Sequence, residues 1–213
     1  MQNNMGLHVA FVSGGKDSYY AVYRYGGRVD VGIVLIYEFP RPSPHIVNIG
    51  KSIETLLLSG LPIVVVKLNK NREFSETAEV LRKLDAEILI AGDVYVEEHL
   101  NYMEKLAKEV GATLIEPLWG YDPLELIYKE FESGIRSVVI GCINPLDKWL
   151  GVELTVNNIS NFVEEAINLG IDPLGERGEY HTVVVHGPLH KTSMSYKVIE
   201  KLTFDDYSIL RIV

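Results

Sequence analysis

The sequence predicts an α/β fold with a mostly parallel sheet, followed by a smaller α+β part. Two observations predict the sheet: short apolar runs alternate with amphipathic segments, and turn residues end most of the apolar runs. The third observation is a change of pattern after Pro117, where strand-like stretches follow one another closely enough to form a hairpin. We therefore expect one domain at residues 1–118 and a smaller one at 119–213.

Periodicity and turn residues assign the elements of the first part in order. The expected strands are residues 8–12, 31–37, 62–68, 87–91 and 112–115, which are short and apolar. The expected helices are residues 19–25, 46–59, 74–84 and 96–110, and Gly26, Gly60 and Gly111 end three of them. Repeated strand–helix units of this kind bind ligands beyond the carboxyl ends of their strands.

The second part reads as a mixture of helices and strands. Helices are expected at residues 122–133 and 158–169, and strands at 135–140, 182–185, 196–202 and 207–213. The last two strands are joined by residues 203–206, which predicts a hairpin. No long linker rich in proline, glycine or serine separates the two parts, so we expect them to pack closely.

Composition excludes several classes of protein. The chain has 213 residues, of which 47% are hydrophobic and 23% charged, as in a globular protein with a sizeable core. Its net charge of −9 makes nucleic acid an unlikely partner, because broad binding needs a basic face. Cys142 is the sole cysteine, so an internal disulfide and a cysteine metal cluster are excluded. The apolar runs are too short to span a bilayer, and we expect a cytoplasmic protein with no membrane partner.

The most informative segment is Ser13-Gly14-Gly15-Lys16-Asp17-Ser18, here called the glycine turn. It lies between the first expected strand and the first expected helix, where main-chain N–H groups and a helix N-terminus can bind phosphate. Its serines offer hydroxyl groups and its lysine a positive charge, whereas Asp17 either caps the helix or holds a metal ion. The turn is not a Walker A loop, because Asp17 stands where that loop has serine or threonine.

Three other segments carry candidate site residues. Tyr37-Glu38 and Gly92-Asp93 follow two expected strands, although Tyr37 could equally pack and Asp93 cap a helix. The third, Gly175-Glu176-Arg177-Gly178-Glu179-Tyr180-His181-Thr182, is here called the acidic loop. Such a loop either orients a substrate, holds magnesium or positions a general base, or is a solvated loop whose charges pair with each other.

The glycine turn resembles the S-G-G-x-D-S signature of the PP-loop ATP pyrophosphatases. With Gly92-Asp93, residues 116–120 (Glu-Pro-Leu-Trp-Gly), the acidic loop and Gly187-Pro188, nearly the whole chain resembles the diphthine–ammonia ligase family. One departure is Arg177, where that family often has a smaller residue. The resemblance implies a PP-loop domain, of the adenine nucleotide alpha hydrolase-like type, and a smaller α+β substrate domain.

The resemblance also implies a reaction. ATP, with Mg²⁺, would activate the diphthine carboxylate of translation elongation factor 2 as an acyl-adenylate. Ammonia would then give diphthamide, AMP and pyrophosphate. The ATP-binding candidates are Ser13, Gly14, Gly15, Lys16, Asp17, Ser18, Tyr37, Glu38, Gly92 and Asp93, with Asp17 as the metal ligand. The catalytic candidates are Asp17, Glu176, Glu179 and His181. One of the last three would take a proton from ammonium, although His181 could equally be a satisfied strand histidine.

Two other functions compete with this interpretation. A PP-loop transferase acting on RNA would commonly use paired cysteines as sulfur carriers, which the lone Cys142 disfavours. A nucleotide-binding sensor without turnover would need the glycine turn but not the acidic loop.

Overall fold

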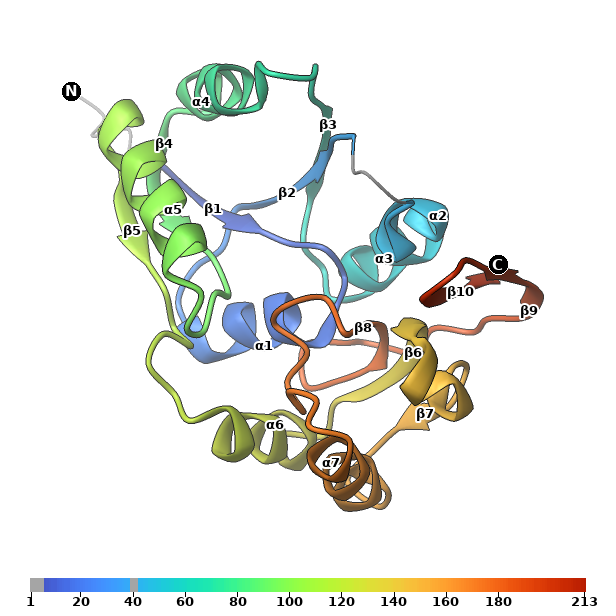
Figure 1. Cartoon of the computed structure of the whole chain (residues 1–213). Coiled ribbons are helices and arrows are strands. Elements are labelled where there is room, and N and C mark those ends of the chain that lie inside the picture. The colour runs from blue at the N-terminus through green and yellow to red at the C-terminus, as the bar shows by residue number, and fades with distance from the viewer. Residues whose placement is uncertain (1–5, 39–41) are drawn as a thin grey trace.

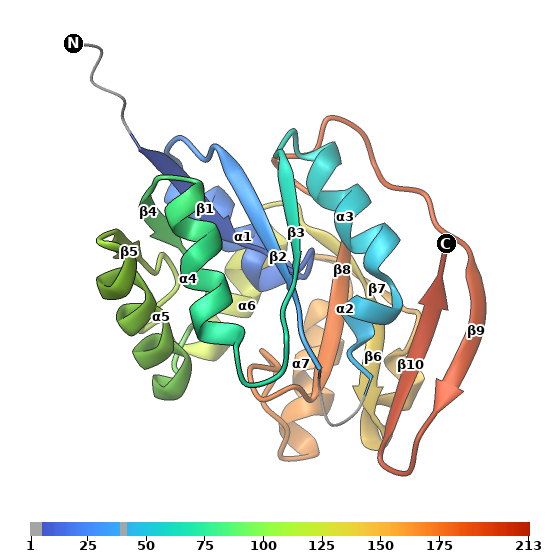
Figure 2. The ribbon, with the colours of Figure 1, turned by 90° about the horizontal axis from the view of Figure 1, so that it is seen from above.

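The first part of the chain forms a five-stranded parallel sheet in the order β3-β2-β1-β4-β5. The structure is a computed structural model and describes residues 6–38 and 42–213. The strands are β1 (Leu7–Phe11), β2 (Val31–Ile36), β3 (Ile63–Lys67), β4 (Ala86–Ile90) and β5 (Thr113–Ile115). Each strand pairs in parallel with its neighbour, which confirms the predicted sheet (Figures 1 and 2).

Helices cover both faces of this sheet. The helices α4 (Glu73–Lys83) and α5 (Glu97–Val110) pack on one face, and α1 (Lys16–Tyr25) and α3 (Ile49–Leu58) on the other. Alternate residues of β1 divide between these layers, because successive side chains of a strand point to opposite faces. Val9 lies in the core beneath α4 and α5, whereas Ala10 lies in the core beneath α3.

The second part forms a five-stranded antiparallel sheet with two helices. Its strands are β6 (Arg136–Ile143), β7 (Glu153–Leu154), β8 (Tyr180–His186), β9 (Val198–Thr203) and β10 (Tyr207–Ile212). The central strand β6 pairs with β7, β8 and β10, and β9 forms the predicted hairpin with β10. The helices α6 (Pro123–Glu132) and α7 (Ile159–Asn168) complete the α+β arrangement that the sequence predicts, together with the 3₁₀ helix η1 (Asn144–Trp149).

The helix expected at residues 46–59 is divided in the structure. A short helix α2 (Pro44–Val47) precedes α3, and Asn48 lies between them. The Asn48 side chain donates hydrogen bonds to the main-chain oxygens of Pro44 and Leu210 and accepts one from Ile212 N–H. These contacts to β10 satisfy a buried amide, and they are made by residues too distant in sequence to predict.

The helix α1 lies between the two parts of the chain, as Figure 1 shows. Its residues Tyr19 and Tyr20 are almost fully buried in a core shared with α6, α7 and β8, so the two sheets are joined through this helix. Tyr23, on the same helix, is 40% exposed. Within residues 6–38 and 42–213, no helix combines the length and apolarity needed to cross a membrane.

Candidate functional site

The glycine turn follows β1 and is fixed by two distant elements. Gly14 has a φ of +84°, and a Cβ there would lie 2.8 Å from the main-chain oxygen of Ser52, so glycine is required. Val184 N–H in β8 donates a hydrogen bond of 3.0 Å to Gly14 O. The turn therefore reaches its conformation only when α3 and β8 are in place.

The two serines of the turn stabilise it from within. Ser13 Oγ accepts a hydrogen bond of 3.2 Å from Gly15 N–H, and Ser18 Oγ donates one of 3.2 Å to Gly15 O. The N-cap of α1 is Gly15, with no capping side chain, so Asp17 does not cap the helix. Its side chain is 30% exposed and ion-paired with Lys16.

The side chain of Lys16 points into the protein. It is 1% exposed and lies between Asp17 and Glu130 of α6, with the Glu130 oxygen at 3.2 Å and the Tyr180 ring centre at 5.7 Å. Burial lowers the pKa of Lys16, but the two carboxylates outweigh it and raise this pKa well above its usual value. Burial raises the pKa of the Glu130 carboxyl group well above its usual value; the positive charge of Lys16 opposes this rise and the Asp17 carboxylate adds to it. Lys16 stays a predicted ATP-binding residue, and its ammonium group lies inside the protein.

The acidic loop lies directly against the glycine turn. Lys16 N–H donates a hydrogen bond of 3.2 Å to the Thr182 hydroxyl. Asp172 fixes the start of the loop by accepting hydrogen bonds from Leu174 N–H and Glu176 N–H, at 3.0 and 3.2 Å. Two segments far apart in the sequence therefore form one site.

Carboxylates gather where these segments meet. Burial, followed by the charge of Asp17, raises the pKa of Glu176 to about 7. Burial and Asp93 raise the pKa of Glu116 to about 8, and one Glu116 oxygen accepts a hydrogen bond from Asp93 N–H at 3.2 Å. The structure thus brings the predicted residues Asp17, Asp93 and Glu176 together and adds Glu116.

A metal ion at this cluster would need ligands from outside the protein. In the part of the chain that the structure describes, no three His, Cys, Asp or Glu side chains are placed to hold a metal ion. Magnesium usually takes only one or two protein carboxylates and completes its shell with water and substrate phosphates. Asp17 fits that requirement, since its carboxylate is 30% exposed at the turn.

The remaining predicted residues occupy different places around the turn. The His181 ring lies 5.4 Å from that of His45, whose pKa is lowered to about 3 by burial and by His181. Glu179 accepts a hydrogen bond of 3.0 Å from Arg177 N–H within the acidic loop. Gly92 packs on α1, where a Cβ would lie 3.2 Å from Asp17 O.

Tyr37 and Glu38 are both exposed and follow β2 at the carboxyl end of the sheet. Partial burial of the phenol and the neighbouring Tyr102 of α5 raise the pKa of Tyr37. Asp93 forms an ion pair of 3.2 Å with His99, and the N-cap of α5 is Val96, so Asp93 does not cap that helix.

Two protein-family models match this chain. The diphthamide synthase N-terminal domain matches residues 6–114, and the diphthamide synthase C-terminal domain matches residues 122–213. The chain belongs to the diphthamide synthase family. A search of curated proteins gave no match.

One solved structure is similar over most of this diphthamide synthase family chain. It is described as a predicted subunit of tRNA methyltransferase from Methanocaldococcus jannaschii, and the match covers 89% of this chain and all of the other. The sequence identity is 16% and the TM-score 0.44.

Sequence reasoning gave no role to four residues of this diphthamide synthase family site. Asp172 and Glu116 hold main-chain N–H groups of the acidic loop and of Asp93, and His45 contacts the glycine turn. Of these four residues, Glu130 is the one that the sequence pattern could have identified most easily. It lies on the buried stripe of α6 with Leu126, Ile127 and Phe131, and an acid on the apolar face of a helix needs a buried partner.

Two surface hollows lie away from the glycine turn. One, of about 630 Å³, lies between η1 and α7 beside Trp149, and the other, of about 390 Å³, lies beside Tyr23 at the end of α1. Neither is lined by the predicted site residues. The candidate site is therefore defined by its polar groups.

Proposed function

We propose that this protein catalyses the ATP-dependent amidation of the diphthine carboxylate on elongation factor 2. Ammonia is the nitrogen donor, and the products are diphthamide, AMP and pyrophosphate. The observation that carries the proposal is the hydrogen bond from Lys16 N–H to Thr182, which joins the glycine turn to the acidic loop. A nucleotide held by the turn then has its phosphates next to the segment that presents the acceptor.

The glycine turn is proposed to bind the phosphates. The main-chain N–H groups of Asp17 and Ser18, at the N-terminus of α1, and the hydroxyl groups of Ser13 and Ser18 favour an anion at this point. A Cβ on Gly15 would lie 3.2 Å from the His45 ring and 3.3 Å from Thr182 O, so a larger residue there would push against both neighbours of the turn. Asp17 is proposed to hold Mg²⁺ against the phosphates, where the ion neutralises the charge of departing pyrophosphate.

The chemistry requires an activated acid. A carboxylate is a poor acylating agent because its leaving group would be an oxide, whereas an acyl-adenylate releases AMP. The protein must hold the carboxylate in line with the α-phosphorus and stabilise pyrophosphate as it leaves. Gly92 and Asp93 border this position, and Tyr37 and Glu38 are proposed to border the adenosine.

The acidic loop is proposed to prepare the nucleophile. Ammonium must lose a proton before it can attack, and a base whose pKa lies near neutral pH does this best. Glu176, whose pKa is raised to about 7, fits this role. Glu179 and His181 are the alternative bases. Both belong to the acidic loop as defined above, and His181 is also part of β8.

The test is to incubate the protein with ATP and Mg²⁺ in four mixtures. They contain unamidated elongation factor 2 with ammonium, the factor alone, RNA with ammonium, or ammonium alone. The proposal expects AMP and pyrophosphate in the first mixture, together with a mass loss on the factor that matches conversion of acid to amide. AMP that forms only with RNA would point to a transferase, and no AMP in any mixture would point to a nucleotide sensor.

A further inference from the structure

Lys16 of the glycine turn forms a buried ion pair that the proposed reaction does not use. Lys16 is 1% exposed and Glu130 is 0% exposed, and their charged atoms lie 3.2 Å apart. Glu130 belongs to α6, in the second part of the chain, whereas Lys16 is the first residue of α1. This pair therefore links the turn to a helix outside the nucleotide-binding sheet.

Glu130 depends on Lys16 for charge compensation. Within residues 6–38 and 42–213, neither carboxylate oxygen of Glu130 accepts a hydrogen bond of normal geometry, and its polar neighbours are the Lys16 ammonium group and the Asp17 carboxylate. If Lys16 moved outward to a phosphate, the fully buried Glu130 carboxyl group would lose its positive partner and keep only the Asp17 carboxylate, which repels its charge. Removing one member of a buried pair costs much more than an exposed contact returns.

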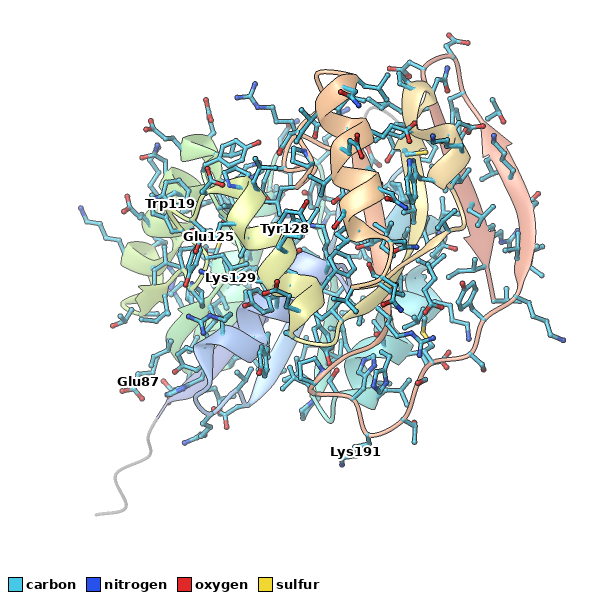
Figure 3. The ribbon with its side chains drawn as sticks, turned by 90° about the horizontal axis from the view of Figure 1, so that it is seen from below. Glu87, Trp119, Glu125, Tyr128, Lys129 and Lys191 are labelled. Atoms are coloured by element: carbon cyan, nitrogen blue, oxygen red, sulfur yellow. The ribbon has the colours of Figure 1, made fainter. Side chains whose placement is uncertain are left out.

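An exposed ion pair on the same helix α6 contrasts with this buried pair. Lys129 and Glu125 also form an ion pair, but both side chains are exposed, on the outer side of α6 (Figure 3). Water can compensate either charge of that pair if the other leaves. The Lys16–Glu130 pair has no such access, and its geometry is correspondingly fixed by the surrounding core.

We propose that Glu130 is a positioning residue of the glycine turn. It holds the Lys16 ammonium group inside the protein, so that the turn presents its main chain and serine hydroxyl groups, rather than this lysine, to phosphate. The inference rests on the proposed function for the identity of the ligand, ATP. It differs from the sequence prediction, in which Lys16 contacts the phosphates directly.

The variant Glu130→Gln separates the two roles of Lys16. If Glu130 anchors the lysine, the variant binds ATP about tenfold more weakly, because the turn loses its fixed inner contact. The KM for ATP should rise while kcat changes by less than about threefold, since Glu130 does not touch the reacting acid. ATP binding as tight as that of the wild type, or tighter, would show that Glu130 restrains a lysine that binds phosphate, and would overturn the proposal.

A double variant guards against simple misfolding. Lys16→Met combined with Glu130→Gln removes both buried charges, so it should unfold at a higher temperature than Lys16→Met alone. It should also bind ATP at least about fivefold more tightly than Lys16→Met, because no unpaired carboxylate remains beneath the turn. Equal ATP binding by these two variants would contradict the anchoring role. The matched control is Glu125→Gln, which breaks the exposed pair on the same helix and should bind ATP as the wild type does.

Chemical labelling tests the anchor without any nucleotide. With acetic anhydride and mass spectrometry, Lys16 should react much more slowly than Lys129 in the wild type, and faster in Glu130→Gln. Fast labelling of Lys16 in the wild-type protein would refute the anchor. If the wild type binds no ATP, the proposed function fails, and the labelling result still decides whether Glu130 holds Lys16.

Discussion

The main-chain N–H of Lys16 donates a hydrogen bond of 3.2 Å to the hydroxyl group of Thr182, which lies 166 residues later in the chain. Thr182 is the third residue of β8, and its side chain is buried. This bond connects the nucleotide candidate residues with the acceptor candidate residues. It makes the site depend on both parts of the chain being folded.

Replacing Thr182 by valine should weaken this connection with little change in volume. The variant leaves a buried N–H without an acceptor, so the free energy of unfolding should fall by about 1–3 kcal/mol. The KM for ATP should rise, because the turn loses a contact that orients its main chain. Urea unfolding and ATP titration measure the two effects. Thr182→Ser keeps the hydroxyl group, so its free energy of unfolding and its KM for ATP should be close to those of the wild type. If Thr182→Ser is as impaired as Thr182→Val, the hydrogen bond is not the cause.

Replacing Asp17 by alanine should abolish ATP-dependent turnover and leave the fold intact. Its carboxylate is the proposed magnesium ligand, and the fold should survive its loss because the buried Lys16 keeps its ion pair with Glu130. AMP formation with elongation factor 2 and ammonium measures turnover, and circular dichroism reports the fold. Glu104→Ala, an exposed acid on α5, is the control and should keep wild-type activity. Normal AMP production by Asp17→Ala would refute the role.

Stability should fall as pH rises because Glu176 ionises late in the folded protein. Burial and Asp17 raise its pKa from 4.5 to about 7, so between these values the unfolded chain loses the proton and the folded protein keeps it. Unfolding thus releases a proton in this window, and a higher pH favours the unfolded state.

The variant Glu176→Gln removes this titration. It should gain stability over the wild type as pH rises from 4.5 to 7, reaching roughly 1–3 kcal/mol above pH 7, and gain nothing from this source at pH 4. Urea unfolding at pH 4, 6 and 8 measures the difference. If the gain in the free energy of unfolding does not vary with pH, the difference between the variant and the wild type comes from packing and not from ionisation of Glu176.

The fold was predictable because its signals are local. Each strand of the parallel sheet is a short apolar run, and glycines end α1 and α5 where the sequence places them. The division at Asn48 was not predictable, since it depends on main-chain groups of Leu210 and Ile212. A helix pattern in residues 46–59 contains no information about which distant strand will compete for that amide.

The site was predictable only in part for the same reason. The glycine turn and the acidic loop carry dense polar motifs, whereas Glu116 and Asp172 act through main-chain groups that a sequence does not reveal. The direction of the Lys16 side chain could not be predicted from the sequence either. A lysine in a phosphate-binding pattern suggests a phosphate contact, and only the position of Glu130 shows an alternative partner inside the protein.

The His45 imidazole should stay neutral throughout the physiological pH range. Burial and the neighbouring His181 lower its pKa to about 3, although a hydrogen bond with the Ser13 main chain acts in the opposite direction. The ring contacts Gly15, so a neutral His45 leaves the attraction for phosphate to the main chain and the helix N-terminus.

NMR of the protein with labelled histidine tests this. Between pH 5 and 8 the His45 ring signals should not move, whereas His99, whose pKa is raised by Asp93, should titrate above 6.5 and serve as an internal reference. Because unfolded histidine takes up a proton below about pH 6.5 and His45 does not, this group makes stability fall as pH falls toward 3. His45→Gln should lose that contribution. A His45 midpoint near 6.5 would mean that the ring is open to water, and that it carries a positive charge to the glycine turn at neutral pH and below.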